Sequence, residues 1–104
     1  MSKPVRPTEA AETEIRYYLN WYESERPGLA DRLWSEIQDV VHLISDHPAA
    51  GSTIPRVRAV GGVRRFPLRR FPFFVIYREF DDYLELVALA HHRRRPRYWR
   101  SRLL

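Results

Sequence analysis

Cysteine is absent from this chain of 104 residues, and lysine occurs once, at Lys3. Without cysteine there is no disulfide, no thiolate nucleophile and no cysteine-ligated zinc. No apolar stretch approaches the roughly 18 residues of a membrane span. The N-terminus also lacks the apolar run of a signal peptide. These absences predict a cytoplasmic protein that makes no contact with a membrane.

Signatures of common catalytic sites are missing too. The sequence has no carboxylate pair, no glycine-rich phosphate loop and no nucleophile elbow. We therefore expect no metal and no cofactor. If the protein is an enzyme, it has to act with arginine, histidine and tyrosine, the side chains that suit a phosphodiester substrate.

Arginine is abundant and unevenly placed. Residues 1–52 hold five basic side chains against nine acids, a net charge of −4, whereas residues 53–104 hold thirteen arginines against four acids, a net charge of +9. The planar guanidinium group suits carboxylate and phosphate partners. The C-terminal half is therefore predicted to bind an acidic partner.

The N-terminal half has the pattern of two helices. Apolar residues at helical spacing predict a helix over Glu9–Glu25, with Thr8 as its N-cap. The triplet Arg26-Pro27-Gly28 ends it, and a second apolar stripe predicts a helix over Leu29–Asp46, which His47-Pro48 terminates. Two helices joined by so short a turn form an antiparallel hairpin.

The C-terminal half has the pattern of strands. We expect strands over Val57–Arg70, Phe73–Glu79 and Tyr83–Ala90, with the continuously apolar Phe73–Glu79 in the middle of a meander. Pro67 lacks an amide donor and predicts an edge position or a bulge. Lys3–Pro7 could add a brief edge strand.

The fold class predicted is α+β. A helical hairpin packs on an antiparallel sheet of three to four strands, followed by a short C-terminal helix, in one domain over residues 1–104. Residues 49–55 are expected to form a loop.

Side-chain alternation along the last strand predicts its two faces. Leu84, Leu86, Ala88 and Ala90 form an apolar row that is expected to meet the helices. The other row carries His91 and is expected to lie on an open face, which Arg65 and Arg69 could share.

The segment from His91 to Arg100 combines five arginines and two histidines with Tyr98 and Trp99. It is either a contact for a polyanion, with aromatic rings that could stack on bases, or a solvated basic tail that docks on the core. His91 or His92 could be a general acid or base, because imidazole titrates near neutrality.

Three blocks of the chain resemble the RelE/ParE superfamily of toxins. The resemblance to the family's helical hairpin lies in residues 17–33, with YY, WY and RPGLADRL, followed by HP at residues 47–48. The central hairpin of the family is similar to VRRF and RFPFFVIYR in residues 63–78, and its last strand and C-terminal motif to VALAHHRRRP and YW in residues 87–99.

The resemblance implies the toxin of a bacterial type II toxin–antitoxin module. It implies as partner a cognate antitoxin whose acidic segment wraps the toxin in a hetero-oligomer and which alone contacts operator DNA. Members of the ParE-like branch poison DNA gyrase, whereas RelE-like members cut messenger RNA on the ribosome. A third hypothesis is a relative that has lost toxicity and serves only as a binding module.

The resemblance also implies site residues. For a nuclease they are the catalytic candidates Arg65, His91, Arg93 and Tyr98. An arginine of RelE-like nucleases falls on Phe74 here, and a second basic position falls on Pro67, so the ParE-like branch and gyrase are favoured. The residues implied to bind the target or antitoxin are Arg64, Arg65, Arg69, Arg70, Arg94, Arg95, Arg97, Trp99 and Arg100.

Overall fold

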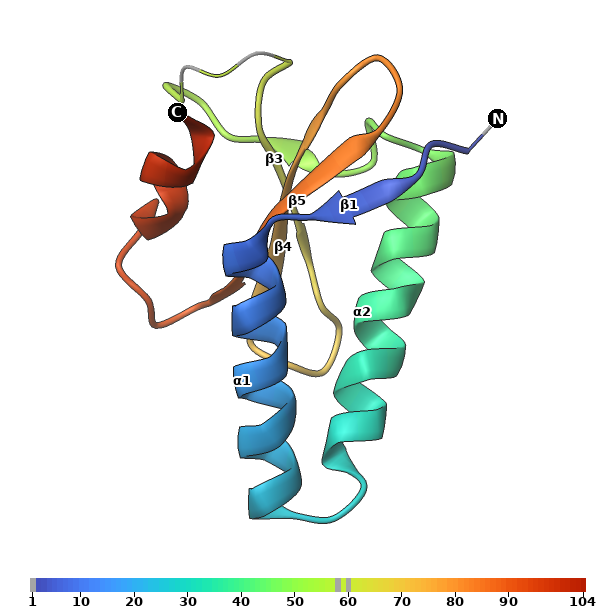
Figure 1. Ribbon diagram of the computed structural model, residues 1–104, viewed down its shortest axis with the longest axis vertical. Coiled ribbons are helices and arrows are strands. Elements are labelled where there is room, and N and C mark those ends of the chain that lie inside the picture. The colour runs from blue at the N-terminus through green and yellow to red at the C-terminus, as the bar shows by residue number, and fades with distance from the viewer. Residues whose placement is uncertain (1, 58, 60) are drawn as a thin grey trace.

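The computed structural model describes residues 2–57, 59 and 61–104. Its elements follow in the order β1 (Val5–Pro7), α1 (Glu9–Glu25), α2 (Leu29–Asp46), β2 (Ser52–Thr53), β3 (Arg64–Pro67), β4 (Phe73–Glu79), β5 (Leu84–His91) and the 3₁₀ helix η1 (Tyr98–Leu103). Figure 1 shows α1 and α2 side by side in front of the strands, with η1 apart from them. The predicted α+β class is confirmed.

Both helices have the predicted bounds because their ends carry strong local signals. The Thr8 side chain accepts a hydrogen bond from the Ala11 amide at 3.0 Å, which caps α1. Gly28 has a φ of 94°, a left-handed conformation that glycine adopts without strain, and α2 starts directly after it. The Glu23 carboxylate accepts a hydrogen bond from the Gly28 amide at 3.1 Å and so satisfies a donor at the start of α2.

The sheet has five strands in the order β1-β5-β4-β3-β2, one more than the highest number predicted. The meander of β3, β4 and β5 with β4 in the middle is confirmed, and β1 pairs in parallel with β5 as an edge strand. Strand β2 lies in the segment expected to be a loop and has only two residues, so no alternation marks it.

Strand β3 is much shorter than the predicted Val57–Arg70, part of which lies outside the described residues. Gly61 and Gly62 have φ angles of 80° and 71° and form a turn before the strand. Pro67 ends it at a point that β2, which pairs only with Arg64 and Arg65, does not cover. Pro67 therefore has the predicted edge position.

A β-bulge in β5 reverses part of the predicted facing. Ile76 pairs with Ala88 but Tyr77 pairs with Leu86, so Val87 is an extra residue in β5. Leu84, Leu86 and Leu89 consequently belong to the core under the helices. Ala88 and Ala90 do not, contrary to prediction: they lie on the opposite face.

The sheet is covered on both faces. Buried residues of α1 and α2, such as Leu33 and Ile44, pack on one face with Phe73 and Tyr77. On the opposite face a smaller cluster joins Val87, Ala88 and Ala90 to residues of η1, namely Trp99 and Leu103. The face expected to be open is therefore partly covered by the C-terminal segment.

Candidate functional site

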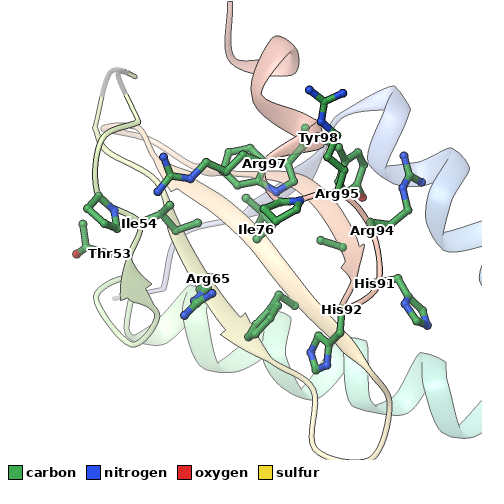
Figure 2. Close-up of a pocket in the computed structure, with 15 residues that line it drawn as sticks. Thr53, Ile54, Arg65, Ile76, His91, His92, Arg94, Arg95, Arg97 and Tyr98 are labelled. Carbon is green, nitrogen blue, oxygen red and sulfur yellow. The ribbon is translucent and has the colours of Figure 1, made fainter.

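A cavity of about 430 Å³ lies on the sheet face opposite the helices, and we name it the sheet-face cavity (Figure 2). Its floor comes from neighbouring strands, with Arg65 on β3, Phe74 and Ile76 on β4 and Ala90 on β5. The chain between β5 and η1 closes it on one side. The remaining lining residues are Thr53, Ile54, Pro55, His91, His92, Arg94, Arg95, Pro96, Arg97, Tyr98 and Trp99.

The charge of this cavity is positive. Four guanidinium groups and two imidazole rings line it, and its lining residues, all within the described part of the chain, include no carboxylate. Like charges gathered around a concave surface focus the potential and attract an anion. The sheet-face cavity is therefore suited to a carboxylate or a phosphate.

Flat side chains on the cavity floor hold Arg65 in place. Its guanidinium carbon lies 4.7 Å from the centroid of the Phe74 ring, in the range of a cation–π contact. The His92 ring packs on Phe74 at a centroid distance of 4.5 Å. Stacking uses the face of a guanidinium group and leaves its N–H edges for a ligand.

His91 lies at the rim of the cavity, and its ring contacts the helix side of the sheet. The ring is 5.1 Å from Phe73 and 6.1 Å from Tyr18, centroid to centroid. The predicted position of His91 on the open face is therefore wrong, because the extra residue Val87 reverses the face on which the later side chains of β5 lie. Burial lowers the pKa of His91, and the positive charges of His92 and Arg93 lower it further.

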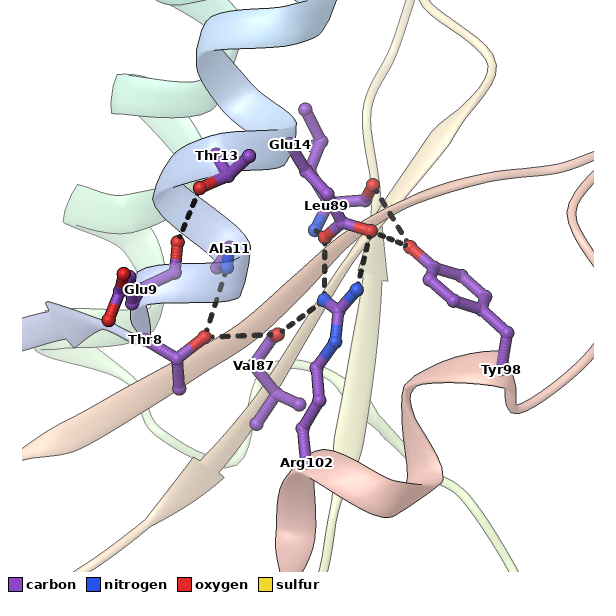
Figure 3. Close-up of polar contacts among 9 residues, drawn as sticks. All are labelled: Thr8, Glu9, Ala11, Thr13, Glu14, Val87, Leu89, Tyr98 and Arg102. Atoms are coloured by element: carbon purple, nitrogen blue, oxygen red, sulfur yellow. Dashed lines mark hydrogen bonds and ion pairs between the residues drawn. The ribbon is translucent and has the colours of Figure 1, made fainter.

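Tyr98 is tied to the first helix rather than free in the cavity. Its hydroxyl donates a hydrogen bond to a Glu14 carboxylate oxygen at 2.5 Å (Figure 3). Burial first, and then this bond to Glu14, raise the pKa of Tyr98 well above its ordinary value. The phenol therefore stays protonated, and its proton is committed to Glu14.

Glu14 and Arg102 extend this contact and were missed by the sequence analysis. The Arg102 guanidinium donates to both Glu14 oxygens, at 2.7 and 3.0 Å. Glu14 also accepts from the Leu89 amide at 3.2 Å, and Arg102 donates to the Val87 carbonyl at 3.1 Å. These bonds satisfy the part of the β5 edge that β1 does not reach.

Only one weak signal in the sequence could have pointed to this group. Glu14 stands beside Ile15 at the border of the apolar stripe of α1, where a carboxylate can turn toward the sheet. Arg102 has no feature that distinguishes it from the other arginines of the tail.

The structure divides the predicted nuclease residues. Arg65 and Tyr98 line the sheet-face cavity and His91 lies at its rim, but Arg93 is not among the lining residues. The Arg93 amide instead donates to Nδ1 of His91 at 3.0 Å. The four residues are thus not assembled around one point.

The predicted binding arginines are divided as well. Arg94, Arg95 and Arg97 line the sheet-face cavity together with Trp99. Arg64 donates to the Gly51 carbonyl at 2.8 Å, a contact within the fold. The other three lie elsewhere: Arg100 is near the C-terminus, and Arg69 and Arg70 border a separate cleft on the helix side, so the predicted open-face position of Arg69 is wrong.

Two further findings concern the described part of the chain. It contains no group of three histidine, aspartate or glutamate side chains placed to hold a metal ion. None of its helices is long and apolar enough to cross a membrane.

The chain is similar to known proteins in both sequence and fold. Residues 5–96 match the model of a family described as ParE toxin of type II toxin-antitoxin system, parDE. The chain is also similar to a solved structure titled "Chromosomal ParDE TA system from P. aeruginosa", with 20% identity and a TM-score of 0.70 over 86% of this chain and 96% of that one. Among curated proteins the sequence has no match.

Proposed function

Because this chain belongs to the ParE family of type II toxins, we propose that it arrests growth by binding DNA gyrase and that a cognate antitoxin neutralises it. The proposal has the toxin act by protein contact and not by cutting RNA. Gyrase is the target implied by the ParE-like branch, which the sequence favoured.

One observation carries this choice of target. Phe74, the position at which the resemblance to RelE-like nucleases implies an arginine, contributes an apolar ring to the sheet-face cavity, and the Tyr98 hydroxyl is already bonded to Glu14. A nuclease has to place a proton donor or acceptor within hydrogen-bond reach of the scissile bond. A cavity with guanidinium groups but with its tyrosine already bonded is better suited to holding a carboxylate of a protein.

Purified toxin in a gyrase supercoiling assay tests the proposal. We expect micromolar toxin to inhibit supercoiling, and the charge reversal Arg65→Glu to weaken the inhibition by about tenfold, because it places a carboxylate beside the bound carboxylate. Arg16→Glu, the same change at an exposed site of α1, is the matched control. Gyrase that remains fully active at micromolar toxin would contradict the proposal.

A second candidate function is a ribosome-dependent endoribonuclease, which the gathering of Arg65, Arg94 and His92 in one cavity favours. In that case Arg65→Ala and Arg94→Ala should relieve growth arrest while the proteins stay folded, and with the unmodified protein translation should stop before supercoiling changes. Healthy growth on induction without antitoxin would instead support a non-toxic binding module.

A further inference from the structure

A second arginine-lined cleft lies on the helix side of the sheet, and we name it the hairpin cleft. It has a volume of about 790 Å³ and lies where α1 ends, α2 begins and the β3–β4 turn approaches the helices. Its arginines are Arg26, Arg32, Arg69 and Arg70. They come from three separate stretches of sequence, so only the fold brings them together.

In the described part of the chain, none of these four guanidinium groups has a hydrogen-bond or ion-pair partner. Within the described residues, each lies beyond ion-pair distance of every carboxylate and donates no hydrogen bond to the protein. All four side chains are exposed. The cleft therefore offers several unpaired cations at one place, and a partner that supplies carboxylates gains charge-assisted hydrogen bonds there.

Glu36 of α2 places two of these arginines. Its Oε1 accepts hydrogen bonds from the backbone amides of Arg69 and Arg70, at 2.8 and 3.0 Å. The bonds hold the β3–β4 turn against α2 and leave both arginine side chains to extend from the turn. Glu36 thus acts on the backbone, and it does not neutralise the guanidinium groups by direct contact.

The floor of the hairpin cleft favours a peptide over a nucleic acid. Tyr22, Leu29, Phe71 and Pro72 form an apolar surface between the charges. The Tyr22 and Phe71 rings pack in a T-shaped contact at a centroid distance of 5.1 Å, which holds them together as one apolar surface. Glu36 and Asp39 also line the cleft, so its positive and negative charges alternate with apolar surface. A peptide can place acidic side chains at the arginines and apolar side chains on the floor, whereas a nucleic acid carries a negative charge at every phosphate.

The linings of the two clefts are adjacent at one end of the sheet. Pro72 lines the hairpin cleft, and its carbonyl accepts a hydrogen bond at 2.8 Å from the amide of His92, which lines the sheet-face cavity. One extended segment that passes around this end of the sheet can therefore contact arginines on both faces.

We propose that the hairpin cleft binds an acidic segment of the antitoxin, with carboxylates on the four arginines and an apolar side chain on the floor. The inference rests on the proposed function, because it takes the antitoxin as the partner. It assigns the hairpin cleft to neutralisation and leaves contact with the toxic target to the sheet-face cavity.

Fluorescence anisotropy with two labelled probes tests this. The probes are a short peptide that alternates glutamate with leucine and a single-stranded oligonucleotide of similar length. We expect the unmodified protein to bind the peptide, and the double variant Arg32→Glu/Arg70→Glu to bind it at least tenfold more weakly. Arg16→Glu, exposed on α1 outside both clefts, should change it less than twofold.

Three results would overturn the inference. The protein could fail to bind the peptide, or the double variant could bind it as tightly as the unmodified protein does. The double variant could also weaken binding of the oligonucleotide as much as binding of the peptide. Circular dichroism of the double variant checks that it is folded. The supercoiling assay is run in parallel and should show inhibition by the double variant equal to that of the unmodified protein. If neither protein inhibits gyrase, the proposal that gyrase is the target is wrong. The peptide measurement still tests whether the hairpin cleft binds an acidic segment.

Discussion

At the scale of single residues, His91 packs on its neighbours as a neutral imidazole ring. Its ring packs against Tyr18 and Phe73, and its Nδ1 accepts a hydrogen bond from the Arg93 amide. An imidazole that accepts at Nδ1 carries its proton on Nε2 and is neutral. The lowered pKa of His91 also favours the neutral ring, since burial and neighbouring positive charge both disfavour the imidazolium form.

Stability should therefore depend on the protonation of His91. The unfolded chain binds a proton near the ordinary histidine pKa of about 6.5, whereas the folded chain binds it only at lower pH. The contribution of His91 to the free energy of unfolding should be complete above the unfolded-state pKa and should be lost as the pH falls from there toward the lower pKa of the folded state. Urea titrations between pH 7.5 and 5 should show a shallower fall for His91→Gln.

The matched control for this titration is His42→Gln, which removes an exposed histidine of α2. It separates the effect of this one imidazole from a general loss of titratable groups. The same pH dependence in His91→Gln and in the unmodified protein would show that His91 does not contribute.

Among the elements, η1 depends on a small set of polar contacts. Glu14 joins α1 to η1 through Arg102 and Tyr98, and to β5 through the Leu89 amide (Figure 3). The side chains of Glu14 and Arg102 are 11% and 21% exposed, so their ion pair is shielded from water more than a surface pair is. Such pairs contribute more than the near-zero median of exposed ones.

Glu14→Ala should destabilise the protein by about 2–4 kcal/mol, because it leaves Arg102 unpaired and the Leu89 amide without its acceptor. Chemical denaturation followed by circular dichroism measures the loss. Glu12→Ala, an exposed acid in the first turn of the same helix, should cost less than about 1 kcal/mol. Equal losses in the two variants would mean that the Glu14 contacts contribute nothing beyond a helix charge.

The sequence predicted the helices better than the strands, for physical reasons that differ. Thr8 and Arg26-Pro27-Gly28 act on their immediate neighbours, so the bounds of α1 and the start of α2 follow from local chemistry. The bulge at Val87 is a property of two paired strands, and alternation along one of them does not reveal it. Arg65 lies within β3 and was placed on its correct face. His91 follows the bulge, and Arg69 lies beyond the end of β3, where alternation no longer applies, so both were misplaced.

On the scale of the whole molecule, charge follows the layers of the fold. The acidic half of the chain contains both helices, and the basic half contains β3, β4, β5 and η1. The linings of the two arginine-lined clefts are adjacent at one end of the sheet, where the Pro72 carbonyl accepts a hydrogen bond from the His92 amide. A partner with acidic segments is therefore steered toward this end of the molecule.

Binding of the glutamate–leucine peptide should consequently weaken as salt is added. Between about 0.05 and 0.5 M salt the screening length falls to a few ångströms, and we expect affinity to fall by about tenfold. An isotherm that does not change with salt would assign the binding to the apolar floor of the hairpin cleft alone. The charge-neutral analogue with glutamine in place of glutamate is the matched control.

The bulge at Val87 also affects how residues are compared between relatives. It inserts one position into β5, so a related strand without it needs a gap at this point in an alignment. An ungapped alignment would shift every later position by one and equate His91 with a neighbour whose side chain has the opposite orientation. Functional residues transferred to this C-terminal segment from other toxins are therefore assigned correctly only when structures, and not sequences alone, are superposed.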